Sequence, residues 1–198
     1  MYKANVKKFV DHVRSECKAH GVKLMLRRRT YVVVSRSLKC SGYFDGINKE
    51  LVVAINQRGW LGVLVHEFAH MTQWLDNCKA WKDSMNHPDD VDDWLNGKEL
   101  KNIKRTIAVT RNLELDNEKR SVKLMKQWDL PIDIKDYTQK ANAYIQFYNW
   151  LYFTRRWCSP ENSPYKNPKV YKEMPTVFRM NYRKMSDKYI KIFEEAGI

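Results

Sequence analysis

The feature that most restricts the fold of this chain is a segment of helical period between residues 60 and 75. Its large apolar residues are spaced 3, 4, 3 and 4 positions apart, at Leu61, Leu64, Phe68, Met71 and Leu75. This spacing gathers them on one face of an α-helix. His66, His70 and Gln73 fall on a different face. The segment therefore predicts a helix with one face for the core and a separate face that carries two histidines.

Residues 66–70 read His-Glu-Phe-Ala-His, an HExxH motif. Two histidines four residues apart stand one helical turn apart, so both imidazoles can reach a single Zn²⁺ ion. Glu67 lies beside them, where a carboxylate can take a proton from zinc-bound water without ligating the metal. The motif predicts a zinc site in which His66 and His70 are ligands and Glu67 is the catalytic base.

A hydrolytic zinc site needs a third protein ligand and one open position. Glu114 and Glu118 are four residues apart on a predicted helix, so one can bind zinc while the other accepts a hydrogen bond from a ligand histidine. His87, in an Asn-His-Pro sequence, is an alternative third ligand. We favour Glu114 over His87 as the third ligand, because a helix holds a ligand more firmly than a loop does.

Length and composition indicate one soluble domain over residues 1–198, with a core of about 1–128 and a helical extension of about 129–198. The apolar runs are too short to span a membrane, and the N-terminus has no signal-peptide pattern. Four scattered cysteines without a CxxC pair favour reduced thiols in the cytoplasm. The net charge of +13 suits anionic partners, either nucleic acid or an acidic protein, and is equally compatible with a lysine-rich surface that is simply solvated.

The order of predicted elements is a helix, a small sheet that leans to antiparallel pairing, and then helices, which is typical of an α+β fold. The predicted strands are 22–26, 30–35, 42–44 and 51–55, with a hairpin turn over 45–49. The acidic stretch 79–97 reads as a loop. The predicted helices are 3–19, 60–75, one or two within 98–128, 134–157 and 176–196.

HExxH with a downstream ExxxE resembles the gluzincin metallopeptidases. The strand pattern from Gly42 that runs into the HExxH helix is most similar to the ImmA/IrrE-like and minigluzincin group, over about Cys40 to Ser121. The resemblance implies a small zincin-like antiparallel or mixed sheet, an active-site helix and a zinc-dependent endopeptidase. It also implies that Glu114 is the zinc ligand and that Glu118 supports the ligands without binding the metal. It also implies an edge strand, 42–44 or 51–55, that pairs with an extended polypeptide substrate.

The chain differs from that group in having no recognisable DNA-binding or sensor region. It is similar in style to small, lysine-rich metallopeptidases of tailed phages, which would place it in the cytoplasm of a host cell. Two further interpretations stay open. A third histidine at the position of His87 resembles the SprT-like proteases, which cut DNA-crosslinked proteins. A basic module with a structural or degenerate zinc site could instead dock on nucleic acid.

A hydrolase of this kind also needs a group that stabilises the oxyanion of the tetrahedral intermediate. Tyr144, Tyr148 and Tyr152 are spaced four residues apart on the predicted helix 134–157. Tyr144 and Tyr148 are the candidates for this role. The same spacing is also typical of residues that pack in a core or line a groove.

Overall fold

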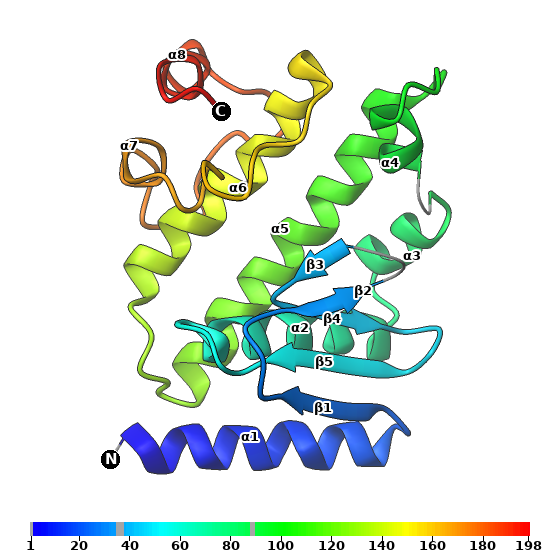
Figure 1. Ribbon diagram of the computed structural model, residues 1–198, viewed down its shortest axis with the longest axis vertical. Helices are drawn as coiled ribbons and strands as arrows, with labels where there is room; N and C mark the ends of the chain where they lie inside the picture. Colours follow the sequence, from blue (N-terminus) through cyan, green and yellow to red (C-terminus); the bar gives the residue numbers. More distant parts are fainter. Residues whose placement is uncertain (1, 35–37, 88–89) are drawn as a thin grey trace. The chain divides into compact units, whose positions relative to one another are not determined.

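The computed structural model describes residues 2–34, 38–87 and 90–198, and the chain divides into two compact units. We call residues 1–78 with 120–132 the sheet unit, and residues 79–119 with 133–198 the helical unit. A small mixed sheet and a helical C-terminal half confirm the α+β class (Figure 1). The prediction of one domain over 1–198 stays a prediction.

The described residues of the sheet unit form two helices, five strands and the end of a third helix. They are α1 (Tyr2–Ala19), β1 (Lys23–Arg27), β2 (Val32–Val34), β3 (Leu38–Cys40), β4 (Gly42–Asp45), β5 (Glu50–Ala54), α2 (Trp60–Leu75) and the last part of α5 (Ile103–Gln127). Three strands form a sheet in the order β1-β5-β4, in which β5 pairs parallel with β1 and antiparallel with β4. The sheet is therefore mixed, with β5 in its centre and β4 at an edge.

The β4–β5 hairpin forms where the sequence predicts it. The side chain of Asp45 accepts hydrogen bonds from the backbone N–H groups of Ile47 and Asn48, which stabilises the turn. Lys49 closes the turn with a positive φ of 54°. Glu50 then pairs with Asp45 across the two strands, which fixes the register of the hairpin.

Strand β5 is buried on both faces. Val52 and Ala54 pack with Val32 of the β2–β3 ribbon on one face. Val53 points to the opposite face, because side chains alternate along a strand, and its cross-strand partner Gly42 contacts helix α2. Helix α2 therefore covers the sheet on the face of Val53, against β4 and β5.

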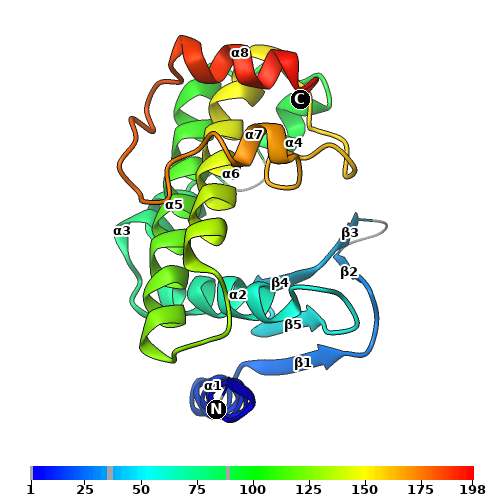
Figure 2. The ribbon, with the colours of Figure 1, turned by 90° about the vertical axis from the view of Figure 1, so that its left-hand side faces the viewer.

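Aromatic contacts fasten α1 and the end of α5 to α2. Phe9 of α1 is fully buried and meets Phe68 of α2 edge to face, with ring centroids 6.0 Å apart. Phe9 also contacts Trp128, just after α5, at 5.8 Å. The HExxH helix is thus held between the sheet and these helices (Figure 2).

The helical unit is built around α6 (Ile134–Thr154). Its other elements are α3 (Lys79–Met85), α4 (Asp90–Leu95), the first part of α5, α7 (Pro168–Tyr171) and α8 (Asp187–Glu195). Its core contains Trp94, Phe147, Leu151, Val170 and Phe193.

One face of α6 carries four carboxamide side chains at spacings of 3, 4 and 3. They donate hydrogen bonds to backbone carbonyls between Lys172 and Tyr182 and so hold this segment along the helix (Figure 2). We call residues 172–182 the strap. The four side chains are Gln139, Asn142, Gln146 and Asn149.

Two sequence-based expectations about the helices need correction, and a third is confirmed. The stretch 79–97, predicted as a loop, contains helices α3 and α4, and Trp94 anchors α4 in the core. The predicted helix 176–196 is limited to α8, because the strap carbonyls bond to α6 instead of to a helix of their own. One or two helices were expected within 98–128, and the structure has one there, α5, which begins at Ile103.

Two further observations concern membrane-spanning helices and the cysteines. No helix in the described part of the chain is long and apolar enough to cross a membrane. All four cysteines, Cys17, Cys40, Cys78 and Cys158, are free thiols.

Candidate metal centre

Helix α2 spans Trp60–Leu75, the bounds that the sequence predicts. Gly59 precedes it with φ +85°, a backbone conformation that side chains disfavour. The carboxamide of Gln57 donates to the Ala54 carbonyl and accepts from the Ser41 hydroxyl, which ties the loop before α2 to the sheet. The start of α2 is therefore fixed relative to strands β4 and β5.

The two motif histidines lie side by side on α2. Their ring centroids are 4.8 Å apart and the rings are nearly perpendicular, at 84°. Leu64 and Phe68 each lie two residues before one of the histidines and therefore on another side of the helix. They are buried, at 0% and 2% exposure. Leu64 and Phe68 thus belong to the core, as the sequence predicts, while His66 and His70 are half-buried.

Glu67 is buried at 8% exposure and lies on the side of α2 that meets strand β4. Its Cγ is close to Gly42: a Cβ added to that glycine would stand 3.2 Å away. Burial, together with the charge of Glu67, raises the pKa of the Cys40 thiol. The closeness to Gly42 and the effect on Cys40 place Glu67 beside the start of the edge strand β4.

Helix α5 is fastened to α2 within the sheet unit by Arg120. Its guanidinium donates to the Thr72 hydroxyl at 3.2 Å and forms an ion pair with Asp76 at the C-terminal end of α2. Glu114 lies six residues before Arg120 on the same uninterrupted helix.

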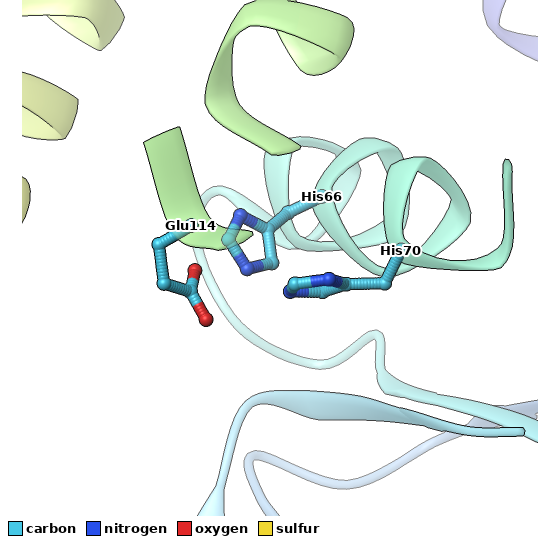
Figure 3. A group of neighbouring side chains, drawn as sticks. All are labelled: His66, His70 and Glu114. Carbon is cyan, nitrogen blue, oxygen red and sulfur yellow. The ribbon is translucent and has the colours of Figure 1, made fainter. Parts of the chain in front are cut away.

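His66, His70 and Glu114 form a potential metal-binding group, the only one of at least three His, Cys, Asp or Glu side chains among the described residues. One ligand atom from each lies within 4.8 Å of the other two, and the side chains converge in Figure 3. Zinc bonds of about 2.0–2.2 Å allow ligand atoms to lie up to about 4.4 Å apart, so small side-chain rotations suffice. Two imidazoles and one carboxylate are a donor set that zinc uses in hydrolases, so the residues fit the ion.

The other candidate ligands have different positions. His87 is not part of this group, so Glu114 supplies the third ligand atom there. Glu118 is buried at 5% exposure one turn after Glu114 on α5. Its predicted role as support for the site stays a prediction.

The electrostatics of His70 suit a metal ligand. Burial, and then the neighbouring His66, lower the pKa of His70 to about 3, while a hydrogen bond with Gln73 opposes the shift. The imidazole is therefore neutral near pH 7. A histidine must be neutral to bind a metal.

In the helical unit, Tyr144 and Tyr148 lie close enough to Glu114 to sense its charge. Burial, and then the Glu114 carboxylate, raise the pKa of both tyrosines well above the usual value. Their hydroxyl oxygens are 2.8 Å apart and hydrogen-bonded. Both side chains therefore remain protonated and can act as hydrogen-bond donors.

Sequence reasoning missed two contributors to the site. It placed Gln73 on the histidine face but not as a hydrogen-bond partner of His70; the i, i+3 spacing was the available signal. Arg120 was missed because its partners, Thr72 and Asp76, are more than 40 positions away in sequence. No local pattern indicates such a contact.

Comparison of this chain with protein-family models, with curated proteins and with solved structures finds no match.

Proposed function

We propose that this protein is a zinc-dependent peptidase of the gluzincin type. The observation that carries the proposal is the convergence of His66, His70 and Glu114, with Glu67 next to the first of them. This combination supplies three protein ligands for a metal and a separate carboxylate that can act as a base. The strand order supports the same reading, since an edge strand passes beside that base.

Zinc bound by His66, His70 and Glu114 would polarise the substrate carbonyl and make a water molecule more acidic. Glu67 would accept the proton of the attacking water and then deliver it to the nitrogen of the departing amine. Burial of Glu67 suits this role, because a carboxylate in a largely dry site has few competing hydrogen bonds from solvent.

The structure favours one of the two expected substrate strands. Strand β5 pairs on both sides, whereas β4 lies at the edge of the three-stranded sheet. An extended peptide can add to such an edge as a further strand. A substrate aligned along β4 would pass Gly42 and therefore approach Glu67.

Tyr148 is our candidate for the group that stabilises the oxyanion, with Tyr144 as its hydrogen-bonded support. Tyr148 is buried at 4% exposure, and its hydroxyl is hydrogen-bonded to the hydroxyl of Tyr144 at 2.8 Å. A neutral hydroxyl can donate to a developing oxyanion, which a tyrosinate cannot.

Metal analysis combined with a cleavage assay tests the proposal. The protein, purified without chelators, should contain about one zinc per chain. It should cleave members of a mixed peptide library, lose this activity after dialysis against a chelator, and regain it when zinc is added. A protein that takes up no zinc would contradict the proposal. Zinc binding without cleavage, together with salt-sensitive binding to DNA, would favour the basic binding module instead.

A further inference from the structure

Gln73 is a buried polar side chain that follows His66 and His70 on the histidine face of α2. Its exposure is 0%, and its Oε1 lies 2.9 Å from Nδ1 of His70. The two residues are three positions apart on α2, so the contact follows from the helix itself. A carboxamide oxygen only accepts hydrogen bonds, so Nδ1 of a neutral His70 must be the protonated nitrogen.

We propose that Gln73 is a positioning residue that fixes the tautomer and the ring orientation of His70 for metal binding. The inference rests on the proposed function above. With the proton held on Nδ1, the lone pair of the imidazole is on Nε2, and this is the nitrogen that binds the metal. Partners of this kind orient metal-binding histidines, and their loss typically lowers metal affinity about 10- to 100-fold.

The neutral character of Gln73 has a second consequence. Metal-bound histidines most often hydrogen-bond to a carboxylate, a backbone carbonyl or water. A carboxylate at position 73 would add a negative charge to a group that already contains Glu114. A carboxamide orients the imidazole without adding that charge, so a bound zinc ion keeps a larger net positive charge to polarise a substrate.

Two substitutions separate positioning from simple packing. Gln73→Met retains the length and burial of the side chain but removes the acceptor. Gln73→Glu retains an acceptor at the same place. A positioning role predicts that Gln73→Met weakens zinc binding about 10- to 100-fold, while Gln73→Glu binds zinc at least as tightly as the wild type. A packing role predicts the reverse order, because a buried methionine is tolerated and a buried carboxylate is not.

The experiment measures zinc affinity by competition with a chromogenic chelator for the wild type and both variants. In parallel, ¹⁵N NMR of the metal-free protein reports which nitrogen of His70 carries the proton. We expect the Nδ1–H form in the wild type and a mixture of tautomers in Gln73→Met. Equal zinc affinity for wild type and Gln73→Met, or an Nε2–H form in the wild type, would overturn the inference and leave the peptidase proposal intact. Failure of the wild type to bind zinc would instead remove the proposed function and this inference with it.

Discussion

Gly42 of the edge strand and Glu67 of the HExxH helix are packed so closely that no side chain fits between them. A Cβ on Gly42 would lie 3.2 Å from Cγ of Glu67 and 2.8 Å from both Cγ1 of Val63 and the Val52 carbonyl oxygen. The proposed catalytic base and the proposed substrate strand are therefore positioned by the same contact.

Gly42→Ala should displace Glu67, strand β4 or both. We expect a loss of stability of about 1–3 kcal/mol from overpacking, and a loss of peptidase activity with zinc content unchanged, because neither residue is a ligand. Urea unfolding, zinc analysis and a cleavage assay measure the three quantities. The double variant Gly42→Ala/Val63→Ala, which removes one of the crowded groups, should recover part of the stability. Full activity in Gly42→Ala would contradict the proposed role of this contact.

Removal of the proposed ligands should abolish zinc binding. His66→Ala, His70→Ala and Glu114→Ala each leave only two protein ligands, which hold zinc poorly. Glu118→Gln should weaken binding only about 10- to 100-fold, as expected of a residue that supports the ligands.

His87→Ala is the matched control for these ligand variants and should retain wild-type zinc affinity, which chelator competition measures. Loss of zinc in His87→Ala with retention in Glu114→Ala would contradict the gluzincin assignment. It would favour the SprT-like interpretation.

The low pKa of His70 makes the stability of the metal-free protein depend on pH. Burial lowers this pKa from 6.5 to about 3 in the folded state. Between these values the unfolded chain binds a proton at His70 that the folded chain does not, so stability is fully present above about pH 6.5 and falls as the pH decreases toward 3. The expected slope from this group is about 1.4 kcal/mol per pH unit.

Urea unfolding of the metal-free wild type and of His70→Gln at several pH values between 7.5 and 4 measures this slope. Other groups titrate in both proteins, so the difference between the two curves isolates His70. The wild type should lose stability faster than His70→Gln as the pH falls. Parallel curves would show that His70 does not titrate abnormally.

The strap depends on Asn142, which is fully buried. Its Nδ2 donates to the carbonyls of Pro175 and Val177, and its Oδ1 accepts from the Tyr182 hydroxyl at 2.7 Å. Asn142→Leu leaves these groups without a partner and should cost about 1–3 kcal/mol for each group that stays buried. The strap should then open and let the backbone after Arg179, whose side chain is already exposed, enter the active site of trypsin.

Limited proteolysis under native conditions compares the rate of cleavage after Arg179. Tyr182→Phe is the milder control, since it removes only one of the three hydrogen bonds. Cleavage should be fastest in Asn142→Leu and slowest in the wild type. An unchanged rate in Asn142→Leu would mean that the strap is held by other contacts.

Local patterns sufficed where one element carries its own signal. Helix α2 was predicted with the bounds Trp60–Leu75, because its apolar spacing and its histidine spacing both follow the helical period. The β4–β5 hairpin was predicted from the turn residues 45–49, and Asp45 indeed stabilises that turn. His66, Glu67 and His70 could likewise be identified from the HExxH motif alone, without knowledge of distant contacts.

Local patterns failed where distant contacts decide the structure. Helix α3 has no buried residue, so it lacks the apolar face by which a helix is recognised in a sequence. The strap is not helical because carboxamides more than 30 residues away, such as Asn142, bind its carbonyls. Glu114 was favoured over His87 from the sequence, and the structure groups Glu114 with the two histidines.

The measurement that tests the central claim most directly compares Glu67→Gln with the wild type for zinc content and peptide cleavage. Glutamine keeps the size of the side chain but cannot act as a base, so the variant should fold and bind about one zinc per chain. Its rate of cleavage should fall about 10²- to 10⁴-fold, the usual contribution of general acid–base catalysis. Equal turnover by the two proteins at equal zinc content would contradict the account, because Glu67 would then have no part in the chemistry.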